Sequence, residues 1–275
     1  MTDIAGKTAF ITGGANGIGL GIAKALAARG ANLMLIDLNE AALEAAKTGF
    51  AGTNVRVETA ICDVAKADAV RAAADKAIES FGKVHIVVNN AGVALGGLPG
   101  EVDLNDWRWI VDINLMGVVY GVESLVPHIK SHGEGGHIIN VASMAGHIAM
   151  PGMGPYHATK FAVVGYSEAL RAELAGDNIG VSALCPGWVK TGIHKSVANR
   201  PSGGVDLESD EQAAMSEVID KGLPPETVGE WVADCVEANR MHIFTHEDMA
   251  PAVDMRYQMI KADYDAAIAS PLFKK

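Results

Sequence analysis

The stretch "ITGGANGIGLGIAKAL", residues 11–26, decides the fold, because a cluster of glycines joins a short apolar run to a run with helical spacing. Glycines at 13, 17 and 19 permit a tight turn and a close approach of the backbone to a bound group. A pyrophosphate is stabilised at the N-terminus of the helix that such a turn opens. The stretch therefore predicts a strand, a dinucleotide-binding turn and a helix, in that order.

The same alternation of strand and helix continues outward from this stretch. Short apolar runs predict strands at 8–12, 32–37, 55–61, 84–90, 136–143, 179–186 and 241–245, and helical spacing separates the first six. Strands this apolar favour a parallel sheet covered on both faces, and repeated β-α units favour a doubly wound sheet. With no repeat or linker, we expect one α/β domain over 1–275. It has a substrate-loop insertion at 186–225 and a C-terminal helical tail at 246–275.

Bulk composition narrows the class of protein. A content of 49% hydrophobic and 20% charged residues is typical of a globular chain, and the net charge of −11 argues against nucleic acid or an anionic membrane as partner. No apolar run approaches the roughly 18 residues of a membrane span, and the N-terminus does not resemble a signal peptide. The three cysteines are far apart, which indicates reduced thiols in the cytoplasm. His128 with His132, and His242 with His246, do not form metal-binding sets, so no metal is expected.

An acidic residue ends the second predicted strand. Asp37 follows Gly19 by 18 residues, where a carboxylate would accept the hydroxyls of an adenosine ribose. A 2′-phosphate there would face a like charge, and the neighbouring positions hold Asn16, Leu38 and Asn39, none of them cationic. The sequence therefore predicts that NAD is preferred over NADP.

Tyr156 and Lys160 stand four residues apart in a predicted helix, which puts their Cβ atoms about 5–6 Å apart on one face. A phenol with a pKa of about 10 is too weak a base at neutral pH, and lowering that pKa by three units needs about 4 kcal/mol. A cation about 4 Å away supplies roughly that energy at an effective dielectric constant near 20. The two candidate cations are Lys160 and the positive nicotinamide ring of an oxidised cofactor, and we expect them to lower the pKa of Tyr156, which then exchanges a proton with the substrate.

Further segments match one family in order along the chain. The spacing Thr-Gly-x-x-x-Gly-x-Gly from residue 12 is followed by "NNAG" (89–92), "DINLMG" (112–117), "NVASMAG" (140–146), "YHATK" (156–160) and "CPGWVKT" (185–191). Together they resemble the short-chain dehydrogenase/reductase family over residues of about 7 to 245. The resemblance implies a Rossmann-type fold, NAD(P)-linked alcohol–ketone chemistry and the catalytic residues Asn114, Ser143, Tyr156 and Lys160.

The resemblance also assigns roles to these residues. Tyr156 transfers the proton, Lys160 binds the nicotinamide ribose, Ser143 hydrogen-bonds the substrate oxygen, and Asn114 holds a water that relays protons. The implied cofactor-binding residues are Gly13, Asn16, Gly17, Ile18, Gly19, Asp37, Asp63, Val64, Asn90, Ala91, Gly92, Tyr156, Lys160, Pro186, Gly187, Val189 and Thr191. The implied substrate-binding residues are Ser143, Ala145, Met153, Tyr156 and Trp188.

The segments expected near the substrate are mostly apolar. Residues 92–98 and 143–156 contain no Lys or Arg and offer Leu95, Met144 and Met150, which favours a neutral, bulky secondary alcohol or ketone of aryl, alicyclic or steroid-like type. Among the segments expected near the substrate, Lys and Arg occur only in the loop after residue 188. Their positions would allow an anionic tail of the substrate to bind at the rim of the pocket. The long loop after Trp188 carries "RPSGG" (200–204), which we expect to act as a hinge for a lid.

Alternative functions are a polyol or sugar dehydrogenase of the same family, a sugar-nucleotide epimerase, and a dinucleotide-binding regulator without catalysis. The complete set of catalytic residues favours an enzyme. The resemblance implies a homodimer or homotetramer formed through the helices that start near residues 106 and 155. The apolar positions that we expect at this interface are Val118, Val119, Leu125, Phe161 and Leu170.

Overall fold

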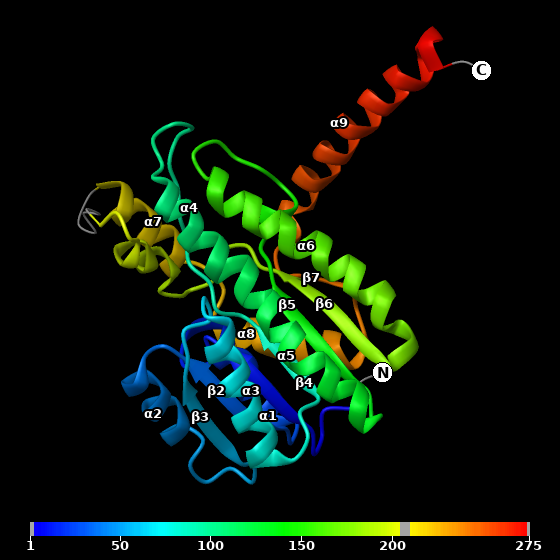
Figure 1. Ribbon diagram of the computed structural model, residues 1–275. Helices are drawn as coiled ribbons and strands as arrows, with labels where there is room; N and C mark the ends of the chain where they lie inside the picture. Colours follow the sequence, from blue (N-terminus) through cyan, green and yellow to red (C-terminus); the bar gives the residue numbers. More distant parts are fainter. Residues whose placement is uncertain (1–2, 204–209, 274–275) are drawn as a thin grey trace.

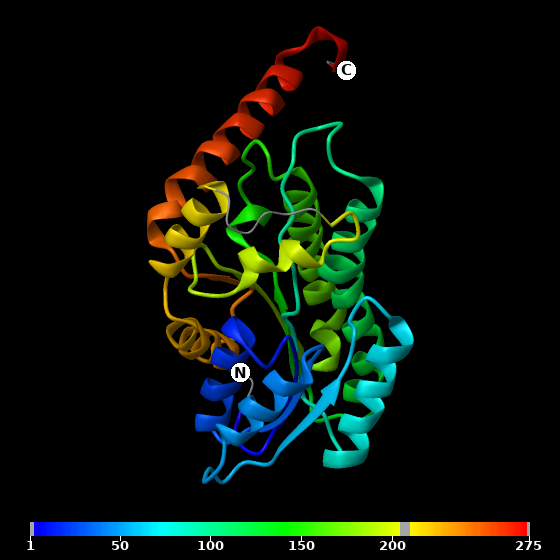
Figure 2. The ribbon, with the colours of Figure 1, turned by 90° about the vertical axis from the view of Figure 1, so that its left-hand side faces the viewer.

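The computed structural model describes residues 3–203 and 210–273. These residues form a seven-stranded parallel sheet in the order β3-β2-β1-β4-β5-β6-β7, with helices on both faces (Figures 1 and 2). The strands are β1 Thr8–Thr12, β2 Asn32–Asp37, β3 Val57–Ile61, β4 Ile86–Asn89, β5 Gly136–Val141, β6 Ile179–Cys185 and β7 His242–Phe244. The helices are α1 Gly17–Ala28, α2 Glu40–Thr48, α3 Ala67–Phe81, α4 Leu104–Val111, α5 Gly117–His132, α6 Gly154–Leu174, α7 Asp210–Asp220, α8 Pro225–Glu237 and α9 Ala250–Ala269. The predicted doubly wound sheet is confirmed.

The strands are apolar because both faces of the sheet are covered. Every residue of β1, β4 and β5 is buried. Neighbouring residues of β1 serve opposite faces, since Ile11 packs with Ile22 of α1 and Val232 of α8, whereas Phe10 packs with Val122 of α5 and Leu170 of α6. Burial on both faces explains why the strands lack the polar alternation of a half-exposed sheet.

The chain reverses its direction of winding between two central strands. β1 pairs with both β2 and β4, so the connections to either side of β1 run in opposite directions across the sheet. Such a reversal leaves a crevice at the carboxyl ends of the strands, where ligands bind in open α/β sheets. Gly13 follows β1 at this edge, Asn90 follows β4, Ser143 lies two residues after β5, and Pro186 follows β6.

One long helical run crosses the molecule. From Leu104 to His132 it comprises α4, a π-helical turn at Asp112–Met116, and α5, and a window of it has a mean hydropathy of 1.4, enough by composition and length to cross a membrane. The sequence predicted no apolar run that approaches a membrane span, and by length and composition this window differs from that prediction. Ile110, Leu125 and Ile129 are fully buried within the subunit, so the run serves here as a core helix.

The expected interface helices present fewer apolar side chains than anticipated. Val118, Leu125 and Leu170 are 2%, 0% and 5% exposed, so they belong to the core of their own subunit. The expectation is wrong for these three, because they lie on the sides of α5 and α6 that face the subunit interior. Val119 and Phe161 are partly exposed and remain available to a partner.

A histidine cluster lies at the opposite end of the sheet from the crevice. Ring nitrogens of His85 and His132 and a carboxylate oxygen of Glu134 lie within 4.8 Å of one another. The Thr8 N–H donates to His85 Nδ1 (3.3 Å), and His132 Nε2 bonds the Val84 carbonyl (3.0 Å). The other nitrogens bond Glu134, whose carboxylate also pairs with two lysines. Because the lone pairs of these rings are already used, the cluster is better suited to hydrogen bonding than to a metal.

Acid should destabilise the fold through its buried histidines. Burial lowers the pKa of His85 and His128, and lowers the pKa of His137 to about 3. Below a pH of about 6.5 these histidines bind protons in the unfolded chain but stay neutral in the folded chain. The free energy of unfolding therefore falls as the pH falls. Urea unfolding at a pH of about 7.5 and of about 5.5 measures this change. Equal free energies of unfolding at the two pH values would contradict the expectation.

Candidate active site

The glycine turn between β1 and α1 forms a cradle of backbone groups. Gly13 and Gly17 have φ values of +60° and +52°, which favour glycine. A Cβ on Gly19 would lie 2.2 Å from the Gly13 carbonyl oxygen, so no larger residue fits there without a shift. Asn16 precedes α1, and its side chain makes no capping hydrogen bond to the backbone amides at the start of the helix. Ile18 contributes one of these amides. These amides suit an anionic ligand such as a pyrophosphate.

Asn90 fixes the glycine turn from the end of β4. Its Nδ2 donates to the carbonyl oxygens of Thr12 (2.9 Å) and Gly13 (3.1 Å). In return, Thr12 Oγ1 accepts the backbone N–H groups of Asn90 (3.0 Å) and Ala91 (3.1 Å). The segment after β4 and the turn after β1 are therefore locked together, which explains the expected role of residues 90–92 beside a dinucleotide.

Asp37 ends β2 beside the same turn. Its carboxylate accepts the backbone N–H of Ala15 (3.4 Å) and of Asn39 (3.1 Å). The cation in the hollow between α1 and α2 is Lys24, and its Nζ lies 2.9 Å from a carboxylate oxygen of Glu226. A ribose beside Asp37 would thus meet a carboxylate, and the lysine of the neighbouring hollow is already paired.

Asp63 and Val64 follow β3 on the adjacent side of the crevice. Asp63 Oδ1 accepts the Ala65 N–H (3.0 Å), which fixes the turn. Val64 is 7% exposed and lies against the start of α5, where a Cβ on Gly117 would be 3.2 Å from its side chain. These two residues follow β3 at the carboxyl ends of the strands, where the resemblance places the adenine of a dinucleotide.

The segment after β6 closes the crevice from the other side. The Pro186 carbonyl accepts the Met144 N–H (2.9 Å), which joins this segment to the end of β5. Val189 is 5% exposed, and the side chain of Thr191 lies 3.2 Å from the position of a Cβ on Gly17. The expected cofactor residues after β6 and in the glycine turn are therefore brought together. Gly187 also belongs to this segment.

Tyr156 and Lys160 lie at the start of α6, where Pro155 begins the helix. Lys160 is 3% exposed, its Nζ donates to the Val141 carbonyl (2.9 Å), and it lies 5.6 Å from the centroid of the Tyr156 ring. A Cβ on Gly92 would be 3.6 Å from Lys160 Nζ. The end of β4, the end of β5 and the start of α6 therefore converge on one lysine.

Asn114 occupies the π-helical turn between α4 and α5. Its Oδ1 accepts the Val93 N–H (2.8 Å), and its Nδ2 donates to the Val93 carbonyl (2.9 Å) and to Thr159 Oγ1 (3.3 Å). Thr159 Oγ1 in turn donates to the Tyr156 carbonyl (2.9 Å). A π-helical turn is frequent at functional sites, and here it lets one buried asparagine tie the loop after β4 to α6.

Burial controls the protonation of the Tyr156–Lys160 pair. Burial raises the pKa of Tyr156, and a hydrogen bond from Ser143 opposes this rise in pKa. Burial lowers the pKa of Lys160 to about 8. The sequence predicted a lowered pKa for Tyr156, whereas burial raises it in the chain alone, and the effect of a bound oxidised nicotinamide on this pKa stays a prediction. The phenol is the main form of Tyr156 near neutral pH.

Ser143 and the loop that follows it are held by a residue that the sequence analysis missed. Ser143 Oγ accepts the Ala145 N–H (3.1 Å). His157 is 6% exposed, its Nε2 accepts the Met150 N–H (3.0 Å), and its Nδ1 bonds the Ala145 carbonyl (2.9 Å). His157 thus fixes the loop between Ser143 and Tyr156. Its position next to Tyr156 was the available signal, but nothing in the sequence indicated bonds to that loop.

The expected substrate-facing side chains divide into two groups. Leu95 is 1% exposed in a small core cluster against which Tyr156 packs, and Met144 is 4% exposed and lines a groove next to β7. The expectation that these two face a substrate at Tyr156 is wrong, because both fill packing positions. Met153 is partly buried, and Trp188 is 38% exposed, so these two remain accessible.

The loop after Trp188 is anchored at two points. Ser196 Oγ accepts the Ala94 N–H (2.9 Å). The backbone N–H and the hydroxyl of Ser202 donate to the carboxylate of Asp106 (3.0 and 2.6 Å), which is 1% exposed. The expected hinge at "RPSGG" is therefore tied to α4 over residues 200–202, and residue 204 lies outside the described residues. Asp106 was not predicted, because its partner is distant in the sequence.

Comparison with known proteins gives one family. The model of the short chain dehydrogenase family matches residues 7–202. The chain is 36% identical to the CLA biosynthesis dehydrogenase/reductase of Lactiplantibacillus plantarum over 96% of each protein, and 40% identical to 3beta-hydroxysteroid dehydrogenase 2 of Eggerthella lenta over 69% of this chain and 74% of that protein. The crystal structure of a short chain dehydrogenase/reductase from Burkholderia phymatum in complex with NAD has a TM-score of 0.89 and 34% identity, covering 96% of this chain and 97% of that chain. Matches over 96% of the chain extend into α9.

Proposed function

Since the chain belongs to the short-chain dehydrogenase/reductase family, we propose that it is an NAD-dependent oxidoreductase that interconverts a bulky, apolar secondary alcohol and its ketone. The observation that carries this proposal is the meeting of Tyr156, buried Lys160 and Ser143 beside the glycine turn. A proton-transfer group and a dinucleotide cradle then share one crevice at the carboxyl ends of the strands.

The crevice suits a dinucleotide. The amides at the start of α1 would bind the pyrophosphate, Asp37 would accept the hydroxyls of the adenosine ribose, and Lys160 would bind the nicotinamide ribose. The remaining expected residues line the same crevice after β3, β4 and β6. When bound, the oxidised dinucleotide supplies the acceptor for the hydride that leaves the carbinol carbon. The Asp37 carboxylate, followed by the uncharged side chains of Leu38 and Asn39, supports NAD over NADP.

Side chains of the protein transfer the proton to and from the substrate oxygen. In the reducing direction, the Tyr156 phenol donates its proton to the substrate oxygen as negative charge develops there. Ser143 donates a hydrogen bond to the same oxygen, which stabilises that charge. In the oxidising direction the phenolate is needed, so the rate should rise with pH. Asn114 and Thr159 act as positioning residues, because they hold the backbone of α6 in place.

An apolar substrate is supported by the surroundings of Tyr156. The ring packs against a cluster of Leu95, Ile110 and Val197, on which Val93 and Trp109 also pack, and Trp188 in the segment after β6 is 38% exposed. Residues 92–98 and 143–156 contain no Lys or Arg that would bind an anionic group. A neutral aryl or alicyclic carbinol matches this chemistry better than a polyol, which would need many hydrogen-bonding partners.

We expect a bulky aryl carbinol to be oxidised with a kcat/KM at least about tenfold higher than that of ribitol. The physical reason is that a polyol would leave hydroxyl groups unpaired against apolar side chains. Incubating the protein with NAD and each alcohol, while following the absorbance of the reduced nicotinamide, gives both values. A preference for ribitol would reject the apolar substrate and leave the dehydrogenase reaction in place.

We also propose that the protein is a cytoplasmic homo-oligomer, with α5 and α6 at one interface. Val119 and Phe161 are partly exposed on these helices and are available for such a contact.

A further inference from the structure

The last helix has almost no packing partners in its own subunit. None of the residues of α9, Ala250–Ala269, is buried, and the helix points away from the body of the molecule (Figures 1 and 2). Contact with the body is made at its first turns, where Val253 packs beside a core cluster and the Arg256 guanidinium lies 4.9 Å from the centroid of the Phe161 ring. We call the residues beyond this point, 257–273, the arm.

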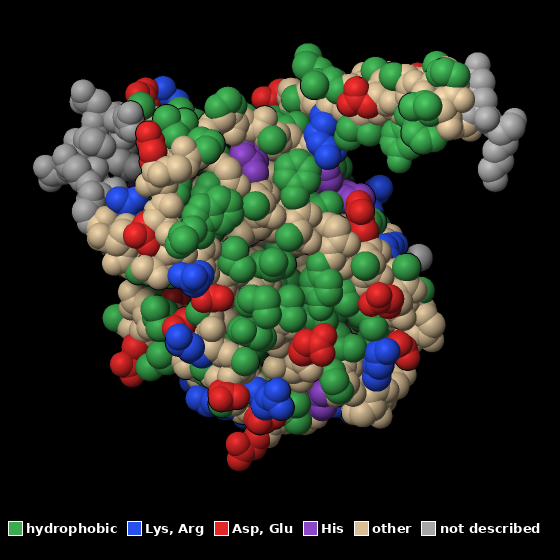
Figure 3. All heavy atoms as spheres, turned by 45° about the horizontal axis from the view of Figure 1, so that its top comes forward, with side chains coloured by type: hydrophobic (Ala, Val, Ile, Leu, Met, Phe, Trp, Pro, Cys, Tyr) green, Lys and Arg blue, Asp and Glu red, His purple; other side chains and the backbone are tan. Residues whose placement is uncertain are grey.

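This helix and its extension expose many large apolar side chains among their charged residues. The large apolar side chains exposed between 255 and 273 are Met255 (67%), Tyr257 (62%), Met259 (66%), Ile260 (39%), Tyr264 (68%), Ile268 (71%), Leu272 (86%) and Phe273 (72%). In Figure 3, hydrophobic side chains, in green, occur along the whole projecting arm. Most of the stability of helices in proteins comes from packing of one face, and an exposed apolar patch of this size marks an interaction surface.

The spacing of the residues shows which side of the arm is most apolar. Tyr257, Ile260, Tyr264 and Ile268 follow one another at intervals of three or four, so they form one stripe. Gln258, Lys261 and Asp265 are on a polar edge, and Lys261 Nζ pairs with the Asp265 carboxylate at 2.8 Å. The stripe therefore suits an apolar groove, and the polar edge remains suited to water.

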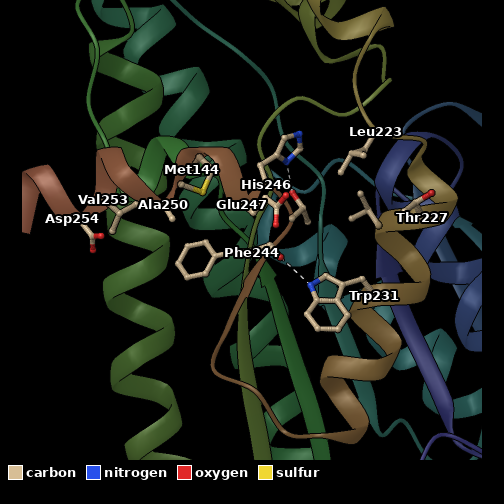
Figure 4. Close-up of a pocket in the computed structure, with 12 residues that line it drawn as sticks. Met144, Leu223, Thr227, Trp231, Phe244, His246, Glu247, Ala250, Val253 and Asp254 are labelled. Carbon is tan, nitrogen blue, oxygen red and sulfur yellow. Dashed lines mark hydrogen bonds between the residues drawn. The ribbon is translucent and has the colours of Figure 1, made fainter.

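A groove of matching character lies at the base of the arm. It has a volume of about 640 Å³ and lies between α8, β7 and the first turns of α9 (Figure 4). Leu223, Val228, Trp231 and Phe244 contribute apolar side chains, and Trp231 and Phe244 are 40% and 41% exposed. We call this hollow the arm groove. β7 is also the last strand of the described sheet, so this edge is open to a partner.

A second copy of the chain fits these two surfaces better than an unrelated partner. A rigid helix that points away from the body cannot fold back into a groove at its own base. A two-fold axis beside β7 would place each arm over the groove of the other copy, since an isologous contact needs both surfaces on one chain. Each aromatic side chain covers roughly 150–250 Å² when buried. Two reciprocal arms, each with seven large apolar side chains, would thus bury over ~1,000 Å², the size at which specific interfaces begin.

We propose that the arm is exchanged between two copies of the chain. The stripe of Tyr257, Ile260 and Tyr264 of one copy packs in the arm groove of the second copy, and the reverse contact forms about the same two-fold axis. This interface is distinct from the one proposed on α5 and α6. The arm groove is connected to the active site in two ways. Met144 of the groove directly follows Ser143 in the sequence, and the Gly187 N–H donates to Thr245 Oγ1 and His246 Nδ1 of the groove at 3.3 and 3.2 Å.

Sedimentation velocity of the full chain at micromolar concentration tests the arm. The double variant Ile260→Glu/Tyr264→Glu places two negative charges in the stripe and should have half the mass of the wild-type particle. The matched control Gln258→Glu/Lys261→Gln makes the same change in net charge on the polar edge and should keep the wild-type mass. If the arm variant kept the mass of the wild-type particle, the proposal would be overturned. That is also the result expected if the arm binds a membrane or an unrelated protein instead of a second copy.

A variant of the groove separates arm exchange from pairing of arm with arm. Trp231→Glu changes the groove and leaves the arm intact, so it should also halve the mass. An unchanged mass for Trp231→Glu would overturn the groove as the receiving site. Circular dichroism shows whether each variant is folded. If the double variant fails to fold, Tyr264→Glu alone carries the same test at a position that is 68% exposed.

Discussion

Tyr156→Phe should lower turnover by roughly two to four orders of magnitude, because it removes the hydroxyl that exchanges a proton with the substrate. The phenyl ring keeps the packing of Tyr156 against the cluster of Leu95, Ile110 and Val197, so the fold should be unchanged. Binding of NAD should survive, since the glycine turn and Lys160 are untouched. Steady-state rates with a secondary alcohol, and titration of NAD against protein fluorescence, measure the two effects.

Tyr166→Phe is the matched control for this experiment. Tyr166 lies on the same helix, ten residues further on, and burial raises its pKa to about 12, but it is not among the groups around Lys160. Its replacement should leave turnover within a few-fold of wild type. Lys160→Ala should lose turnover and also weaken NAD binding, because Lys160 serves both. Activity of Tyr156→Phe within a few-fold of wild type would contradict the proposed proton transfer.

Asp37→Asn should erode the preference for NAD over NADP by at least about tenfold. Two like charges about 4 Å apart repel by about 4 kcal/mol at an effective dielectric constant of 20, and exposure to water reduces this considerably. Asparagine retains an oxygen that can accept the Ala15 and Asn39 N–H groups, so the change removes charge with little change in shape. The ratio of kcat/KM for the two cofactors measures the preference.

Asp75→Asn, an exposed residue on α3, removes the same charge away from the crevice and should leave that ratio unchanged. A wild-type enzyme that is more efficient with NADP than with NAD would contradict the role given to Asp37. The catalytic role of Tyr156 does not depend on this outcome, because the proton transfer is common to both cofactors.

The parts of the site that the sequence predicted are those whose chemistry depends on local spacing. The glycine turn requires three glycines within seven residues, and Tyr156 and Lys160 share a helix face because they are four apart. The alternation of apolar strands and helices likewise fixed the parallel sheet, since both depend on periodicity along the chain.

The parts that the sequence did not predict depend on contacts between distant residues. Asp106 holds Ser202 across 96 positions, and His157 bonds a loop that precedes it, so neither partner follows from spacing. The pKa of Tyr156 also depends on burial, which is a property of the folded chain. For the same reason Leu95 was expected at the substrate although it packs in the core.

The central claim is that a carbinol carbon gives its hydride to a nicotinamide in the crevice beside Tyr156. A secondary aryl alcohol with deuterium on the carbinol carbon tests this directly when it is incubated with the wild-type protein and NAD. The account predicts reduced nicotinamide that carries one deuterium by mass spectrometry, together with the ketone in equal amount. Reduced nicotinamide without deuterium, or no reduced nicotinamide with any alcohol of an aryl, alicyclic and polyol panel, would contradict it.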